Sequence, residues 1–435
     1  MNNSYPMLDE RKKIISWSLY DWANSTFSTT VMAGFFPIFF QQYWSTASEV
    51  TVSTWYLGLA NSIASITVAS LAPFLGAIAD KASVKKRLLI FFAFIGIIST
   101  GSLSMIGQGH WRLAALFYVV ASIGFMSANI FYDSLLPSVA SKQKRDFVSS
   151  LGYSLGYIGG GILFLINVAM YLQPQFFGIA DAPSAIKLSF LTVAFWWAIF
   201  TLPILIFVEE KSPKEDLGIL KSISSGWSEL LSTLKRVREL KVVTTFLLAY
   251  WLYIDGVDTI IRMSVDYGTS LGFTTSTLIT LLLMVQFIAF PATLIYNWFA
   301  RQIGVKHAIL IAIGGYICIT IIGSLVSKEW HFYIIAALIG CFQGGIQALS
   351  RSLYSRIIPP DRAAEFFGFY NMFGKFAAII GPPLMGYVAM ATGNPRYGIL
   401  AIVLLFILGG YFLIKVDVEE GCLLYTSPSP RDQRG

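Results

Sequence analysis

The chain has 435 residues, of which 55% are hydrophobic and only 13% are charged, and its mean hydropathy is +0.65. A typical soluble domain contains about 25% charged residues, so this chain has too few charges to cover a water-exposed surface. The composition excludes an ordinary cytosolic enzyme, a disordered chain and a secreted disulfide scaffold, and it indicates a chain surrounded mostly by lipid. The net charge of +7 does not indicate nucleic acid, because the basic residues lie in short loops between apolar runs.

Apolar runs of about 20 residues, the length that spans a bilayer, recur along the whole chain. The first six predicted spans are 14–40, 54–79, 87–107, 112–136, 147–172 and 186–208. The next six are 242–265, 273–299, 307–326, 331–357, 364–391 and 396–415. We therefore predict an all-α membrane protein with twelve transmembrane helices, divided into an N-terminal six-helix half at 14–208 and a C-terminal half at 242–416.

Lysine and arginine in the loops predict the orientation. Most of them fall on the side that holds the N-terminal segment 1–13, whereas the loops on the other side contribute Arg112, Lys187, Lys328 and Arg396. Positive residues concentrate on the cytoplasmic side of membrane proteins. We therefore expect both termini in the cytoplasm and a multi-pass protein of the cell (inner) membrane.

Two segments lie outside the predicted spans. The stretch 209–241 begins as a polar linker, and its apolar residues from 223 to 234 then recur at helical spacing. It is either an amphipathic helix on the cytoplasmic membrane surface or a plain tether. In the tail 417–435, the last part, 421–435, continues no pattern and has the character of a vector-derived end.

The two predicted halves share landmarks at a nearly constant offset. Matching positions are Lys81 and Arg301, 220 apart, Pro137 and Pro359, 222 apart, and the Asp-Phe and Glu-Phe pairs at 146 and 365, 219 apart. Each landmark begins a cytoplasmic loop or the helix that follows it. Parallel repeats of six helices are one of the transporter architectures, with the substrate site between the halves near the middle of the membrane.

The loop GAIADKASVKKR at 76–87 resembles a motif of the major facilitator superfamily, the one between its second and third helices. Gly76, Asp80, Lys81 and Lys85 fill positions of that motif, while Ser83 stands where the superfamily usually has glycine. Glycine permits close helix packing, and Asp80 can accept hydrogen bonds from a neighbouring helix end. We group these residues with Arg301 and Arg351 as candidates for gating.

Longer strings are similar to the vacuole-effluxer-like branch of that superfamily, also called the "unknown major facilitator" family. They are SWSLYDWANSTF at 16–27, LAYWLYIDGVDT at 248–259, GGIQALSRSLYSRIIP at 344–359 and EFFGFYNMFGKFAAIIGP at 365–382. The resemblance covers residues 12 to 420 and implies the major facilitator fold and secondary transport. The fungal branch is associated with export of amino acids from the vacuole, so the resemblance favours amino acid efflux.

Polar residues inside predicted spans mark a candidate site, because such residues usually face a cavity or a partner. The candidates for substrate or coupling are Asp21, Asn24, Asp255, Asp258, Gln343, Gln347 and Lys375. A zwitterion would suit a cavity with both charges, with Lys375 binding its carboxylate and Asp255 or Asp258 its ammonium group. A buried carboxylate could also carry a proton.

Several of these assignments have alternatives. Asp258 and Arg262 have the spacing of a structural ion pair within one helix. Asp21 either lines the cavity or pairs with Arg351 to close the cytoplasmic gate. Candidate cavity aromatics, which serve in packing more often, are Tyr20, Tyr250 and Tyr370. The run Gly381-Pro382-Pro383 predicts a bend or break in span 364–391.

The predicted function is secondary active transport of a small polar solute by alternating access, with proton coupling as a hypothesis. The expected partners are this solute, the lipid bilayer and protons, for a monomer that binds no nucleic acid. We expect no metal and no cofactor, because the sequence has no CxxC motif and no Cys/His cluster. Alternatives are an exporter of drugs or other metabolites, and a lipid-moving or sensor protein on a transporter fold. An enzyme is disfavoured, because the three histidines lie in different loops.

Overall fold

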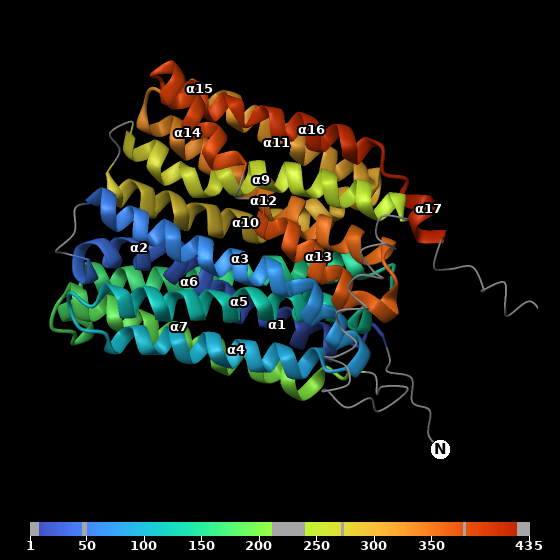
Figure 1. The fold of residues 1–435 in the computed structure, drawn as a ribbon, viewed down its shortest axis with the longest axis horizontal. Coiled ribbons are helices and arrows are strands. Elements are labelled where there is room, and N and C mark those ends of the chain that lie inside the picture. Colours follow the sequence, from blue (N-terminus) through green and yellow to red (C-terminus); the bar gives the residue numbers. More distant parts are fainter. Residues whose placement is uncertain (1–7, 46–49, 211–239, 271–273, 377–379, 424–435) are drawn as a thin grey trace, which may run out of the picture.

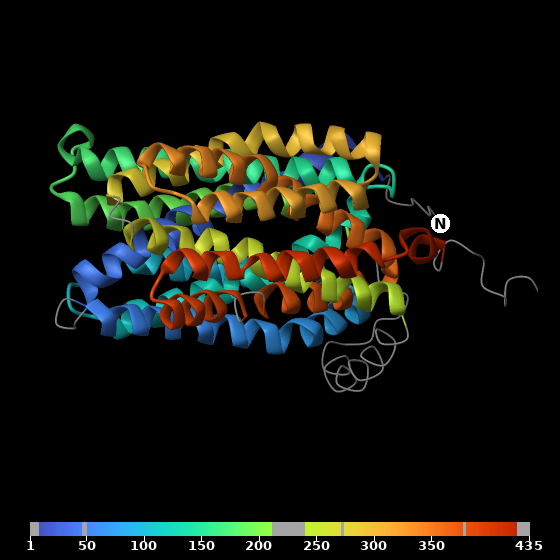
Figure 2. The same cartoon turned by 90° about the horizontal axis from the view of Figure 1, so that it is seen from above.

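The computed structural model describes residues 8–45, 50–210, 240–270, 274–376 and 380–423. Every regular element in these ranges is a helix. The long helices run side by side along one axis and form a single bundle (Figure 1, Figure 2). This arrangement agrees with the long apolar runs, since a helix surrounded by lipid satisfies all of its backbone hydrogen bonds internally.

The N half comprises the elements before residue 211. They are α1 (Arg11–Thr26), η1 (Phe27–Phe35), α2 (Phe36–Phe39), η2 (Phe40–Trp44), α3 (Val50–Ala82), α4 (Lys85–Ser102), η3 (Leu103–Met105), α5 (Trp111–Val139), α6 (Arg145–Leu172), η4 (Pro174–Phe177) and α7 (Ala182–Phe207). The first four form one continuous series, in which η1 and η2 have the wider π-type winding.

The C half comprises the elements after residue 239. They are α9 (Lys241–Ser270), α10 (Thr275–Ile303), α11 (Val305–Ser324), α12 (Glu329–Ile357), η5 (Pro360–Arg362), α13 (Ala363–Phe376), α14 (Gly381–Thr392), α15 (Pro395–Ala401), α16 (Val403–Ile414) and α17 (Val418–Leu423). The expected break at Gly381-Pro382-Pro383 is confirmed, since α13 ends before it and α14 begins at Gly381.

Nine helices in the described part of the chain are long and apolar enough to cross a membrane. They correspond to the predicted spans on α3, α4, α5, α6, α7, α10, α11, α12 and α15–α16. The other three predicted spans fall on the series α1 to η2, on α9 and on α13 with α14. The all-helical membrane fold is therefore confirmed, and the number twelve stays a prediction.

Each half has its own hydrophobic core. One core collects buried side chains from Ile14 to Val208, together with Ala364, and the other collects side chains from Val242 to Val416. The two halves occupy the lower and upper parts of the bundle in Figure 1. They meet where α3 packs against α13, and where α6 packs against α10 and α12.

Two lysines make the same kind of contact at matching positions of the two halves. The Lys86 ammonium donates to the carbonyl oxygens of Leu205 (3.1 Å) and Val208 (2.9 Å) at the end of α7. Lys306, 220 positions later, donates to those of Ile414 and Val416, both at 2.7 Å, at the end of α16. A lysine that caps the last carbonyls of a helix is favoured by the helix dipole. The same cap at the same offset supports the internal duplication.

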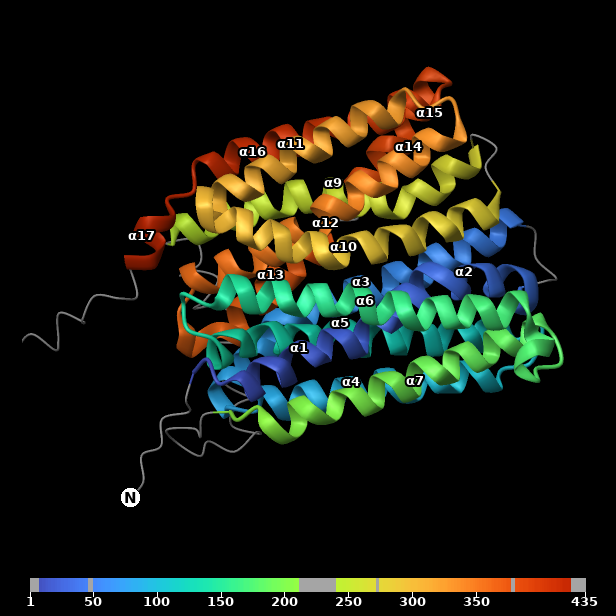
Figure 3. The ribbon, with the colours of Figure 1, turned by 180° about the vertical axis from the view of Figure 1, so that it is seen from behind.

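We call the end of the bundle that carries the loops 83–85, 140–145, 303–306 and 357–363 the basic end. The start of α1 and the helix α17 lie at this end, so both described ends of the chain are on the same side (Figure 1, Figure 3). A Cβ on Gly421 of α17 would lie 2.9 Å from atoms of Ile357 and Val242, so α17 packs on the C half. The predicted amphipathic helix after residue 210 and the tail after Leu423 lie outside the described residues.

Candidate functional site between the two halves

The first seam between the halves joins α3 to α13 at the basic end. Asp80, at the end of α3, accepts hydrogen bonds from the backbone N–H groups of Ala364 (3.1 Å) and Glu365 (2.7 Å). Its carboxylate also pairs with the Lys85 ammonium at 2.6 Å. A carboxylate of one half therefore caps the first turn of a helix in the other half, where the helix dipole favours negative charge.

Glycine makes this close approach sterically feasible. A Cβ added to Gly76 would lie 2.3 Å from the carbonyl oxygen of Ala364. On the facing helix, a Cβ added to Gly368 would lie 2.6 Å from the carbonyl oxygen of Ala72. The two backbones touch on both sides, so the first seam depends on the absence of side chains.

The second seam joins α6 to α12. Asp146 accepts a hydrogen bond from the Ser352 hydroxyl at 2.7 Å and forms an ion pair with Arg356. The Arg145 guanidinium of α6 also reaches α12, where it donates to the carbonyl oxygen of Ser355 at 2.6 Å. Charged side chains of both halves thus take part in this seam, whereas in the first seam a carboxylate of one half meets backbone N–H groups of the other.

Arg351 lies at the centre of a buried cluster that spans both halves. It belongs to α12, is 1% exposed, and its guanidinium pairs with Asp133 at 3.1 Å and with Asp21 at 3.3 Å. Its Nε donates to the Ser149 hydroxyl at 2.9 Å, and Asp21 also accepts from the Tyr132 hydroxyl at 2.8 Å. Of the two alternatives for Asp21, the described contacts are those of the pair with Arg351.

We call the set Arg351, Asp21 and Asp133 the Arg351 cluster. The guanidinium lies over the rings of Trp17 (4.9 Å) and Tyr153 (4.2 Å), which shield it from solvent. Asn371 of α13 donates to Asp133 at 3.3 Å. The cluster therefore gathers α1, α5 and α6 of the N half and α12 and α13 of the C half.

The sequence did not identify Asp133 or Asn371. Asp133 lies near the end of its predicted span, where an acidic residue is common and carries little signal. The one feature that could have indicated Asp133 is its position within an apolar run, because acidic residues there usually have a partner. No local pattern indicates that Asp133 and Arg351, which are 218 positions apart, lie in contact.

The middle of the bundle holds further polar contacts. Gln347 of α12 accepts from the Tyr157 hydroxyl of α6 at 2.8 Å, which links the halves. Asn24 donates to Asn129 at 2.6 Å within the N half. Gln343 lies one turn from Gln347 and is half-buried. Of these predicted polar residues, Gln347 thus bridges the two halves, whereas the described contact of Asn24 stays within the N half.

Asp255 has a structural partner inside the C half. Its carboxylate accepts from the backbone N–H groups of Gly381 (3.0 Å) and Ile380 (3.2 Å), and from the Thr259 hydroxyl (3.3 Å). It therefore caps the first turn of α14, and a Cβ on Gly381 would lie 2.7 Å from it. Asp258, one turn away, is half-buried. The side chains of Arg262 and Lys375 lie outside the described part of the structure.

The predicted aromatic residues are packed. Tyr250 and Tyr370 stack on each other with ring centroids 4.1 Å apart, and Tyr370 also stacks on Tyr354 at 5.0 Å. Tyr20 is fully buried and packs against Tyr132 at 5.0 Å.

Two candidates for gating remain, Arg301 and Lys81, and the Arg301 side chain is exposed at the basic end. The Arg301 guanidinium lies 5.8 Å from the ring centroid of Phe147, which is on the other half. The side chain of Lys81 lies outside the described part. Glu210 accepts from the backbone N–H groups of Lys85 (2.7 Å) and Lys86 (3.1 Å). Burial raises the pKa of Glu210, although these hydrogen bonds act in the opposite direction.

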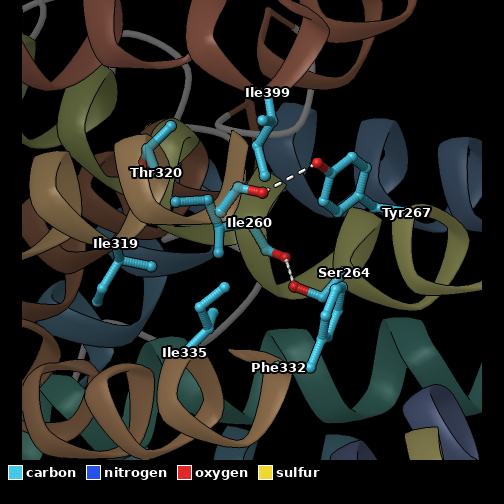
Figure 4. A pocket seen from close by; sticks show the side chains of 9 residues that line it. Ile260, Ser264, Tyr267, Ile319, Thr320, Phe332, Ile335 and Ile399 are labelled. Carbon is cyan, nitrogen blue, oxygen red and sulfur yellow. Dashed lines mark hydrogen bonds between the residues drawn. The ribbon is translucent and has the colours of Figure 1, made fainter. Parts of the chain in front are cut away.

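A small, mostly apolar crevice lies within the C half, near the end opposite to the basic end (Figure 4). Its walls come from α9, α11, α12 and α15. Its polar side chains already have partners: the Ser264, Tyr267 and Thr320 hydroxyls donate to the carbonyl oxygens of Ile260, Gly323 and Tyr316. None of the predicted site residues lines it, so it is separate from the seams between the halves.

The sequence is similar to those of known membrane transporters. The family described as "Vacuole effluxer Atg22 like" matches residues 46–423. The chain belongs to this family. The "Uncharacterized MFS-type transporter YxiO" of Bacillus subtilis is 40% identical over 411 residues, which cover 93% of this chain and 94% of that protein. "Autophagy-related protein 22" of Saccharomyces cerevisiae (strain ATCC 204508 / S288c) is 24% identical over 410 residues, 78% of this chain and 72% of that protein.

Solved structures show the same fold. The human organic anion transporter MFSD10 superposes with a TM-score of 0.71 at 14% identity, over 94% of this chain and 100% of that one. The proton:xylose symporter XylE superposes with a TM-score of 0.69 at 14% identity, over 95% and 98%. The chain therefore has the major facilitator fold, and it is a multi-pass membrane protein of the transporter type.

Proposed function

We propose that this transporter carries a small polar solute by alternating access, as a secondary active transporter. The observation that supports this most is the chemistry of the contacts that hold the basic end closed. Asp80, Asp146 and Arg351 each bridge the halves through polar groups that water can replace. Contacts of this kind can break and re-form, which a rocking motion of two halves requires.

The proposed cargo is an amino acid, and the proposed direction is efflux. Both follow from membership of the vacuole effluxer family and from the polar groups in the middle of the bundle, among them Asp258, Gln343 and Gln347. The contacts of Asp255 with α14 make Asp258 the better candidate for the ammonium group of the solute. Lys375 is the candidate for its carboxylate.

We further propose that transport is coupled to protons, that the monomer is the working unit, and that the basic end faces the cytoplasm of a cell membrane. The clustering of carboxylates at the seams supports proton coupling, because a proton can neutralise a buried carboxylate. The positive loops support the orientation. No metal or cofactor has a part in the proposed cycle.

Liposomes that contain the purified protein test this function. With a pH gradient imposed, uptake of a panel of labelled amino acids should exceed that of empty liposomes and should fall when the gradient is collapsed. Asp258→Asn should abolish the uptake, whereas Asp181→Asn, a change in an exposed loop, should leave it unchanged. Flux that ignores the gradient would remove proton coupling, and no flux for any solute of the panel would remove amino acid transport.

A further inference from the structure

The Arg351 cluster holds an unequal number of charges. Two carboxylates, of Asp21 and Asp133, share the single guanidinium of Arg351, and all three side chains are buried. A buried charge without a counter-charge is costly, and a carboxylate relieves this cost by taking up a proton. By contrast, Asp146 of the second seam has the guanidinium of Arg356 to itself in the described structure.

The two carboxylates are held differently. Asp21 accepts from both terminal nitrogens of Arg351 and from the Tyr132 hydroxyl. Asp133 accepts from one nitrogen of Arg351 and from the Asn371 amide. Asp21 therefore has more of the bonds that stabilise a negative charge. An amide can also turn and present its oxygen, so Asn371 can accept a hydrogen bond from a protonated Asp133.

The partners of Asp133 come from the other half. Arg351 lies on α12 and Asn371 on α13, whereas Asp133 and Asp21 both lie in the N half. The titratable and charged groups that face Asp133 are Asp21 on α1, Tyr132 on α5, Tyr153 on α6 and Arg351 on α12. Because Arg351 is on the C half and both carboxylates are on the N half, a separation of the halves at the basic end would break these contacts. Proton binding at this place is then linked to the position of the halves.

We infer that Asp133 is the residue at which proton binding is coupled to opening of the basic end. A proton from water binds one oxygen of the Asp133 carboxylate, and its bond to Arg351 loses the attraction between opposite charges. The contacts between the halves weaken, and the open state gains population. The inference rests on the proposed proton coupling and names the residue that performs it.

The test measures the opening itself, independently of any solute. Spin labels are placed on Gln143→Cys and Gln302→Cys, two exposed positions on opposite halves at the basic end, in a chain without its native cysteines. Pulsed electron resonance in lipid nanodiscs then gives the distance between the labels. In the otherwise wild-type chain, the fraction at long distance should rise several-fold as the pH is lowered from about 8 to about 5.5.

Asp133→Asn imitates the protonated state without changing the shape of the side chain. The open fraction should then be high at both pH values. The matched control is Asp146→Asn, which removes an ion pair between the halves from the second seam and should keep the change with pH. A pH response that survives Asp133→Asn would overturn the inference, as would a wild-type chain without any pH response.

A second variant covers the case in which Asp133→Asn does not fold. Asn371→Ala removes the amide that stabilises the Asp133 carboxylate, so the midpoint of opening should move to higher pH. An unmoved midpoint would contradict the inference.

The results also distinguish the role of Asp133 from the proposed amino acid transport. Opening that responds to pH without amino acid flux would leave the role of Asp133 standing and remove the cargo, whereas flux without a pH response of opening would do the reverse.

Discussion

The two seams that close the basic end use different chemistry. In the first, Asp80 meets backbone N–H groups of α13, and glycines bring the two helices into contact. In the second, Asp146 of α6 pairs with Arg356 of α12, and Arg351 of α12 pairs with Asp133 of the N half. The first seam therefore depends mainly on shape and the second mainly on charge. Substitutions that change shape should therefore weaken the first seam more, and substitutions that remove charge should weaken the second seam more.

The largest effect is expected at the charged seam. Arg351→Met leaves two buried carboxylates without a cation, and removing one partner of a buried ion pair typically costs about 3–5 kcal/mol. We expect little folded protein, and no measurable solute flux in liposomes from what folds. Arg351→Lys restores the charge without the planar geometry and should recover part of the folded yield. If Arg351→Met transported at the wild-type rate, the charge-based account of the second seam would fail.

The next effect is steric and belongs to the first seam. Gly76→Ala places a methyl group 2.3 Å from the Ala364 carbonyl oxygen, so α3 and α13 must separate. Overpacking of this kind costs about 1–3 kcal/mol, which would raise the ratio of open to closed basic end by about 5- to 150-fold. The distance between spin labels at the basic end measures this. Gly58→Ala on the same helix is the control, since nothing lies within 4 Å of its added Cβ.

Neutralising Asp80 should destabilise the closed state less than Gly76→Ala, which forces the two backbones of the first seam apart. Asn caps a helix about as well as Asp, so Asp80→Asn should change the stability of the closed state by less than about 1 kcal/mol. Asp80→Ala loses the cap and should cost about 1–2 kcal/mol. Thermal unfolding in detergent compares the two variants. Equal losses would mean that the charge pair with Lys85, rather than the cap, holds this seam.

The difference between the seams also shows what a sequence can predict. The apolar runs predict the spans, and the glycines and prolines at 381–383 predict the break in span 364–391, because these signals are local. The loop at 76–87 could be assigned because its residues are adjacent. The roles of Asp133 and Asn371 could not be predicted, because they depend on the contact between Asp133 and Arg351, which is distant in the chain. The contacts of Asp255 could not be predicted either, because the helix break brings the backbone N–H groups of Ile380 and Gly381 to its oxygens.

The smallest effect is expected at Glu210, beside the first seam and outside the membrane. Its pKa in the folded protein is raised above the usual 4.5 by burial, so the folded state binds this proton more tightly than the unfolded state. Stability should therefore fall as pH rises from 4.5 through the raised pKa, and stay lower above it. Glu210→Gln removes this loss, while one hydrogen bond to the start of α4 remains.

The measurement is the melting temperature of Glu210→Gln relative to wild type across this pH range. The difference should shift in favour of the variant as pH rises, by about 1–2 °C in a chain of this size. Glu209→Gln, at the neighbouring position, controls for the loss of one negative charge at the basic end. A difference that is constant with pH would show that the folded protein accommodates Glu210 equally well in both charge states, and would contradict the raised pKa.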